Sequence, residues 1–345
     1  MNCFRIRPLP HARQATSIIA LQSFSQSSDQ EIKFYFMDEQ AKKVEEAHLK
    51  LDYCYMQKQY PVMLYDSCDG CLLFKNRDFL CVRSIFVIWN PKTNEQVTIT
   101  MRGSAFQVCG FYFNPHNNEY EVLLIYPSRE GEIESYAFDV LSFGSKLRRN
   151  IGRYAYMPRS ERPPMIINGK LYWMVDNIYS RGEVNCSTSI MTFKIRTNKL
   201  STMHHGGGSC EEGANVGLFG KHEYMHLIEM EGKLGLCVLS DTELVLWILN
   251  PATNSWAKAH SLTLPRYYPP KYFSCWPNKL DVEVVKIKDR KLLVRQKNRL
   301  LLWDLDLNTH KLLEKKGFEN DNFRPAIHTP SAVSLKTDKL IELDR

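Results

Sequence analysis

VIWNPKTNEQV, residues 87–97, decides the fold: a short apolar strand, a polar turn around Thr93 and the start of a second strand. The same arrangement recurs along the 345 residues. Its other copies are FYFMDEQAKKV (34–44), VLSFGSKLRRN (140–150), FKIRTNKLSTM (193–203), WILNPATNSWA (247–257) and WDLDLNTHKLL (303–313). The turn anchors of successive copies, from Ala41 to Thr309, lie 52 or 56 residues apart. The chain is therefore a repeat of one hairpin-based unit.

A second hairpin precedes each later copy. Its turn carries Gly or a polar pair: Asp69-Gly70, the region of Asn118, Asn168-Gly169, Glu231-Gly232 and Asp289-Arg290. Asn-Gly and Asp-Gly suit two-residue hairpin turns because these residues accept positive φ. Two hairpins give four strands, a to d, in each unit of about fifty residues. This period predicts an all-β fold, a β-propeller of kelch type.

The blade count follows from the ends of the chain. Complete blades are expected near 62–99, 108–151, 163–203, 222–259 and 278–314. Three strands remain near the N-terminus: SIIALQ (17–22), KFYFMD and KKVEEA. They need one more strand to complete a blade, and HTPSAVSL (328–335) can supply it. Joining both ends in a sixth blade closes the ring and removes exposed sheet edges. We expect six four-stranded blades, with seven as the main alternative. Residues 1–15 are expected to form a tail and residues 16–345 one propeller domain.

Composition and charge exclude several classes of protein. Hydrophobic residues make up 44% of the chain, but no apolar run approaches the roughly 18 residues that span a bilayer, so no membrane partner is expected. The net charge of +7 is spread along the chain, whereas nucleic-acid binding usually needs a clustered basic stripe. The ten cysteines lack a paired framework, which favours the reducing cytoplasm or nucleus. Residues 1–28 superficially resemble a transit peptide, but SIIALQ reads as a strand.

Motifs for catalysis or cofactor binding are weak, so we expect neither an enzyme nor a bound cofactor. Cys68-Asp69-Gly70-Cys71 could be half a zinc site, yet it straddles a predicted hairpin turn. The best metal-like cluster is formed by His204, His205, Cys210, His222 and His226. Its first two histidines are adjacent and His226 sits in an apolar strand, so polar loop histidines are the simpler interpretation. The Gly-rich stretch 206–221 lacks the spacing of a phosphate loop.

The strand order separates two kinds of connection. The a–b and c–d turns share one face of the ring, and the b–c and d–a loops share the other. The long stretches 46–61, 152–162, 176–189, 204–221 and 260–277 all belong to the second face. Long loops on a rigid scaffold usually carry recognition. Residues 265–277 concentrate the aromatic and basic side chains that are common at interface hot spots, and the predicted partner-binding residues are Arg266, Tyr267, Tyr268, Lys271, Tyr272, Phe273 and Trp276.

Several segments in a fixed order resemble the plant F-box-associated interaction domain. They are SCDGCLLFKN, VIWNPKTNEQV, CGFYFNPHNNEYEVLLIY, FDVLSFGSKLRRNI, PPMIINGKLYWMV, SIMTFKIRTNKLSTM and MHLIEMEGKLGLC. The resemblance is strong over residues 60–260 and weaker outside them. Two positions depart from the family pattern: Cys71 stands where Leu is usual and Arg148 where Trp is usual.

The resemblance implies a function as a substrate-recognition module. In that family the propeller holds a target protein, while an N-terminal F-box binds the Skp1 subunit of a cullin-RING ubiquitin ligase. Residues 1–15 contain nothing that resembles an F-box, so Skp1 is an expected partner only if an F-box is supplied elsewhere. The alternative is a kelch-like scaffold or a carbohydrate-binding propeller unrelated to ubiquitination.

Overall fold

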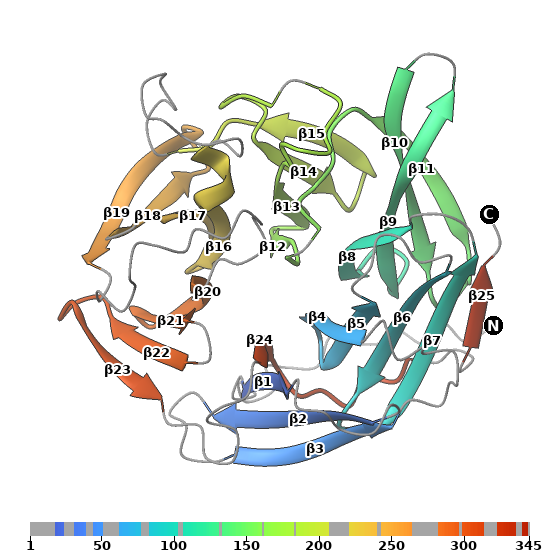
Figure 1. Ribbon diagram of the computed structural model, residues 1–345. Helices are drawn as coiled ribbons and strands as arrows, with labels where there is room; N and C mark the ends of the chain where they lie inside the picture. Colours follow the sequence, from blue (N-terminus) through green and yellow to red (C-terminus); the bar gives the residue numbers. More distant parts are fainter. Residues whose placement is uncertain are drawn as a thin grey trace, which may run out of the picture.

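The computed structural model describes residues 18–23, 31–38, 44–50, 62–76, 83–102, 106–130, 133–160, 162–182, 184–206, 221–239, 243–263, 282–296, 299–313, 323–335 and 340–343. The strands in these ranges form six sheets, which surround a central axis as the blades of a propeller (Figure 1). In every blade except the one that joins the two ends of the chain, the chain runs outward from an inner strand a to a strand d. The predicted fold and the predicted six blades are confirmed.

The blades are numbered from the N-terminus. Blade 1 consists of β24 (Phe323–His328), β1 (Ile18–Ser23), β2 (Glu31–Asp38) and β3 (Val44–Lys50). Blade 2 consists of β4 (Val62–Cys68), β5 (Cys71–Asn76), β6 (Arg83–Asn90), β7 (Glu95–Arg102) and β25 (Leu340–Leu343). Blade 3 consists of β8 (Gln107–Asn114), β9 (Glu119–Glu130), β10 (Ile133–Ser142) and β11 (Arg148–Tyr154).

Blade 4 consists of β12 (Met165–Ile167), β13 (Lys170–Met174), β14 (Ile190–Lys194) and β15 (Lys199–Met203). Blade 5 consists of β16 (Met225–Met230), β17 (Lys233–Leu239), β18 (Glu243–Asn250) and β19 (Ser255–Thr263). Blade 6 consists of β20 (Val282–Lys288), β21 (Lys291–Gln296), β22 (Arg299–Asp304) and β23 (Thr309–Leu313). A short 3₁₀ turn, η1 (Lys221–Tyr224), precedes β16. Within the described ranges, no helix has the length and apolar character that crossing a membrane requires.

Blade 1 closes the ring with strands from both ends of the chain. β24 pairs antiparallel with β1, with Leu21 opposite Pro325 and Ala20 opposite Ala326. The two ends therefore share a blade as expected, but the predicted closing strand, 328–335, is wrong, because the strand ends at His328. Pro325 hides the true strand in the sequence, since proline has no N–H for a sheet. β24 is an edge strand of its sheet, where proline is tolerated.

Residues 329–335 instead run along blade 2. The side-chain amide of Asn90 donates hydrogen bonds to the carbonyls of Ser331 and Val333, at 3.0 and 2.7 Å. The Glu95 carboxylate accepts hydrogen bonds from Leu335 N and Ser334 Oγ, which lower the pKa of Glu95. β25 then pairs parallel with the outer strand β7 and gives blade 2 a fifth strand. The sequence pattern does not anticipate this added strand.

The tight turns have the backbone that the sequence predicts. At Asp69-Gly70, Asn168-Gly169, Glu231-Gly232 and Asp289-Arg290, both turn residues have positive φ. The described c–d turns each end on one positive-φ residue, at Asn94, Lys146, Asn198, Asn254 and Asn308. Positive φ at both turn residues matches the right-handed twist of the hairpin strands. These short turns leave one face of the ring with little projecting surface.

The core consists of apolar layers between adjacent blades. Between blades 3 and 4, for example, Phe138, Leu171 and Phe193 are fully buried. Trp173 bridges the same two blades, because its indole N–H donates a 2.6 Å hydrogen bond to the carbonyl of Cys109. Burying each such side chain contributes roughly 1.5–3 kcal/mol. The blades are therefore held as one rigid scaffold for the loops.

Candidate functional site

The two faces of the ring differ as the strand order predicts. The tight turns lie on one face, called here the tight-turn face, and the b–c and d–a connections form the long-loop face. Some predicted long loops are shorter than expected, because 46–50, 152–154 and 260–263 continue the outer strands β3, β11 and β19. The predicted partner-binding residues Arg266, Tyr267, Tyr268, Lys271, Tyr272, Phe273 and Trp276 lie outside the described residues. That assignment stays a prediction.

Two connections of the long-loop face form one body, called here the loop platform. It consists of residues 155–160, between β11 and β12, and residues 175–182, between β13 and β14. Pro158 and Val175 form an isolated antiparallel bridge between them. Further hydrogen bonds join the two segments: Asp176 N to Met157 O at 2.8 Å, Arg181 N to Ala155 O at 2.8 Å, and Met157 N to Ser180 Oγ at 3.0 Å. Both loops are therefore held by the scaffold and by each other.

Ile178 and Tyr179 project from this platform. Their side chains are 50% and 51% exposed. Their backbone is fixed, because the Asp176 carboxylate accepts hydrogen bonds from both of their amides, at 2.8 and 2.9 Å. The Tyr136 hydroxyl also donates a hydrogen bond to the Tyr179 carbonyl. An apolar and an aromatic side chain are thus displayed on a rigid backbone, which limits the conformational entropy lost on binding.

A cavity of about 240 Å³ lies on the central axis. It is lined by inner strands of five blades and contains both acidic and basic side chains, which are Asp66, Arg159, Arg162 and Glu283. His226 also lines it, and burial together with the charges of Arg162 and Arg159 holds the pKa of His226 well below its usual value. Small-molecule pockets usually occupy roughly 300–1,000 Å³, so this cavity suits a side chain better than a large ligand.

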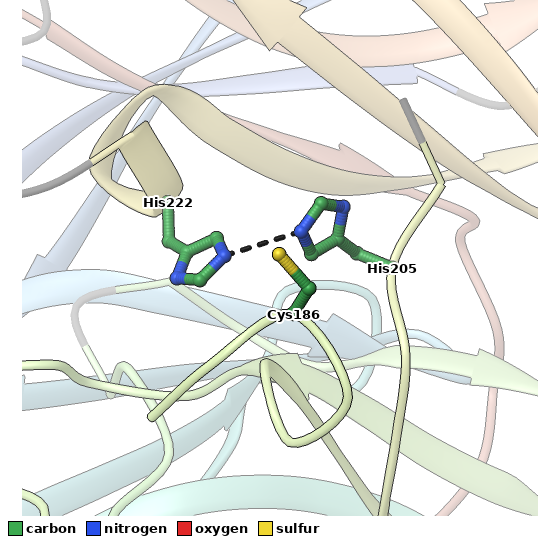
Figure 2. Close-up of side chains that lie close together, drawn as sticks. All are labelled: Cys186, His205 and His222. Carbon is green, nitrogen blue, oxygen red and sulfur yellow. Dashed lines mark hydrogen bonds between the residues drawn. The ribbon is translucent and has the colours of Figure 1, made fainter. Parts of the chain in front are cut away.

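The structure brings together part of the predicted histidine cluster and adds a cysteine to it. The Nε2 atoms of His205 and His222 face each other at 3.1 Å, and the thiol of Cys186 lies beside them (Figure 2). His226 belongs to β16, as predicted, and is not part of this group. Cys210 lies outside the described residues.

Burial keeps the two facing histidines neutral. It lowers the pKa of His205, and it lowers that of His222 to about 4. Both imidazoles are therefore neutral at physiological pH and offer lone pairs. The sequence could not reveal Cys186 as the third member, because it comes from the b–c loop and not from the segment that carries the histidines. The signal that places them together is topological, since b–c and d–a connections share one face.

The Cys68–Cys71 pair behaves as expected. The two residues oppose each other across the β4–β5 turn, and both thiols are free. Burial raises the pKa of both thiols, that of Cys71 to about 12, which disfavours a reactive thiolate. This confirms two strand cysteines that flank a turn.

Comparison with protein families gives a match over almost the whole propeller. The family model described as the F-box associated beta propeller domain matches residues 20–339. Two *Arabidopsis thaliana* proteins named as F-box proteins are also similar to the chain. One is 27% identical over 205 residues, covering 57% of this chain and 47% of its own length. The other is 28% identical over 190 residues, covering 52% of this chain and 35% of its own length. The match thus spans about half or less of each relative.

Solved structures also match the chain, at low sequence identity. TolB from *Acinetobacter baumannii* matches with a TM-score of 0.48 and 10% identity, over 91% of this chain and 67% of that one. A periplasmic gluconolactonase from *Pseudomonas aeruginosa* matches with a TM-score of 0.44 and 13% identity, over 91% and 99% of the two chains. At this level of similarity neither structure bears on function.

Proposed function

Since the chain belongs to the F-box associated β-propeller family, we propose that it binds a target protein as the substrate-recognition module of an F-box-type ubiquitin ligase. The observation that carries the proposal is the loop platform with its two exposed side chains, Ile178 and Tyr179. Family membership supports the class of partner, and the platform supports the place of contact. Docking to Skp1 is assigned to an F-box and not to the propeller.

The geometry of the long-loop face favours a protein partner. Rigid apolar and aromatic side chains supply binding free energy at interfaces because few rotatable bonds are frozen. Arg153 and Arg181 are exposed on or beside the same platform. The aromatic residues of 265–277 are proposed to extend this surface.

Target capture combined with target turnover tests the proposal. The full chain is used as bait in plant extract, beside a double variant, Ile178→Ala/Tyr179→Ala, and a matched double variant, Leu147→Ala/Leu307→Ala. The last two positions are also exposed apolar side chains, but they lie in c–d turns on the tight-turn face. Proteins captured by the wild type and the matched control, and lost from the platform variant, are the targets.

The proposed role in a ubiquitin ligase is tested by a separate measurement, the half-life of a captured target. Inhibition of cullin-RING ligases in plant cells should lengthen the half-life of a captured target. A target that binds through the platform but turns over at the same rate under inhibition would contradict the ligase role. That result would leave the kelch-like scaffold as the better description.

A further inference from the structure

Cys186, His205 and His222 come from separate segments of the long-loop face and converge at one point (Figure 2). Cys186 lies in the connection between β13 and β14, His205 follows β15, and His222 belongs to η1. One potential ligand atom of each residue lies within 4.8 Å of the others. Thiolate and imidazole groups are the usual ligands of Zn²⁺ in proteins. The site is independent of the target-binding proposal.

The separation of the two imidazoles fits a tetrahedral ion. A Zn–N bond of about 2.0–2.1 Å at the tetrahedral angle places two ligand nitrogens about 3.3 Å apart. The Nε2 atoms of His205 and His222 are 3.1 Å apart. With a Zn–S bond of about 2.3 Å, the sulfur should lie about 3.6 Å from each nitrogen. The ligand atoms of the cluster all lie within 4.8 Å of one another, so the Cys186 sulfur needs to approach the nitrogens by at most about 1.2 Å.

The second ring nitrogen of His205 is already engaged as in a metal site. His205 Nδ1 hydrogen-bonds the carbonyl of Gly206. A carbonyl can only accept, so Nδ1 carries the proton and Nε2 presents its lone pair toward His222. Ligating histidines characteristically donate their other N–H to a carbonyl or carboxylate, which fixes the tautomer and the orientation of the ring.

The backbone around the cysteine is fixed as well. The amide of His205 donates a 3.2 Å hydrogen bond to the carbonyl of Cys186, so these two segments are joined directly. The side-chain oxygen of Asn185 accepts hydrogen bonds from the amide and the hydroxyl of Ser187, at 3.0 and 2.6 Å. Ser189 Oγ donates to the Cys186 carbonyl at 3.0 Å. Cys186 therefore stands on a closed turn.

The two histidine segments are anchored to their neighbours. Arg159, which is buried, donates hydrogen bonds to the carbonyls of His222 and Met225, at 3.1 and 3.3 Å. Trp256 donates to the carbonyl of His204 at 3.3 Å, and its ring packs against Gly206 so closely that an added Cβ would lie 2.5 Å from it. The potential ligands are thus pre-positioned by contacts outside the cluster.

We propose that Cys186, His205 and His222 bind one Zn²⁺ ion, with a water molecule as the fourth ligand. The ion connects the loops of blade 4 to the turn that enters blade 5. The competing explanation is a simple hydrogen bond between two neutral imidazoles, with the thiol as a bystander. The two explanations differ in the fate of Cys186 when zinc is added. Only a zinc site makes Cys186 bind the ion as a thiolate and shields it from alkylating reagents.

Zinc binding to the purified full chain tests the site. After treatment with a chelator, the wild type should take up one equivalent of Zn²⁺ and melt at a higher temperature with zinc than without it. Cys186→Ser, His205→Gln and His222→Gln should each weaken zinc binding at least about 100-fold, since even loss of an outer-shell partner costs 10–100-fold. His204→Gln is the matched control, and it should bind zinc as the wild type does.

Two measurements on the wild type keep the test decisive where a variant fails to fold. Zinc should protect Cys186 from alkylation. Mass spectrometry measures how fast this cysteine is modified. Co²⁺ in place of zinc should give the visible bands of a tetrahedral ion and a thiolate charge-transfer band that Cys186→Ser abolishes. The proposal is overturned if the wild type takes up no zinc above a protein without the cluster. It is equally overturned if Cys186 alkylates at the same rate with and without zinc.

Discussion

Ala20 and Ala326 lie opposite each other in neighbouring antiparallel strands, although they belong to opposite ends of the chain. This pairing makes the propeller a ring, because β24 supplies the inner strand of a blade whose other strands come from the N-terminus. Ring closure therefore depends on residues 323–328 and not on the segment that follows them.

Two truncations compare the loss of this closing region with the loss of the outer strand β25. Deleting residues 323–345 removes β24 and should lower the melting temperature of the whole molecule in one cooperative transition, because both neighbouring blades lose a packing partner. Deleting residues 336–345 removes only β25 from the outer edge of blade 2 and should have a clearly smaller effect. Differential scanning calorimetry measures both. Equal melting of the longer truncation and the full chain would refute closure by β24.

Gly70 and Gly169 form a matched pair that measures the contact of the C-terminal segment with blade 2. Both occupy the same place in an a–b turn, with φ of +88° and +69°. A Cβ at Gly169 meets nothing within 4 Å, whereas a Cβ at Gly70 would lie 2.5 Å from Ser331 Cβ. Gly169→Ala should therefore cost only the left-handed strain, about 1–2 kcal/mol. Gly70→Ala should lower the free energy of unfolding, measured with urea, by more than Gly169→Ala does. Equal losses would mean that Ser331 moves away freely.

Arg148 and Asp139 form an ion pair in which the carboxylate is buried. Arg148 Nε donates a 2.6 Å hydrogen bond to the buried Asp139 carboxylate, and its guanidinium lies over the rings of Phe106 and Tyr126. Arg148→Ala should destabilise the fold by about 3–5 kcal/mol, because it leaves a buried charge without its main partner. Adding Asp139→Asn removes that charge and should restore part of the loss. A double variant less stable than Arg148→Ala would contradict this explanation.

Stability should decrease in mild acid. Burial lowers the pKa of His328 to about 4, whereas an unfolded histidine titrates near 6.5. Between these values the unfolded chain binds a proton that the folded chain excludes, so the free energy of unfolding falls as pH falls from about 6.5 to about 4. One such histidine contributes about 1.4 kcal/mol per pH unit. His328→Gln should remove that contribution to the pH dependence of the free energy of unfolding. The measurement is made with a chelator present so that metal binding to other histidines does not contribute. An unchanged slope would show that His328 does not titrate in this way.

The sequence predicts the architecture well because the repeat is local and periodic. Each hairpin carries its own turn residues, so strands such as β16 and turns such as Asn168-Gly169 are identified without knowledge of the ring. Contacts between distant segments are harder. Pro325 disguises an edge strand, and nothing in the sequence near Asn90 indicates that its amide binds Ser331 and Val333.

The candidate sites show the same limit. The sequence identifies the face that carries long loops, but it does not identify Ile178 and Tyr179, whose exposure depends on the turn that Asp176 holds. It also groups His205 with His222 while missing Cys186, since that cysteine approaches only through the packing of two connections on one face.

The affinity of the chain for a captured target tests the central claim most directly. The account predicts that Tyr179→Ala and Ile178→Ala each weaken binding markedly, with a true hot spot losing at least about 2 kcal/mol, or about 30-fold in Kd. Leu147→Ala and Leu307→Ala, on the tight-turn face, should leave the Kd unchanged, and all four variants should melt as the wild type does. If the tight-turn variants weaken binding and the platform variants do not, the target binds the opposite face and the account is wrong.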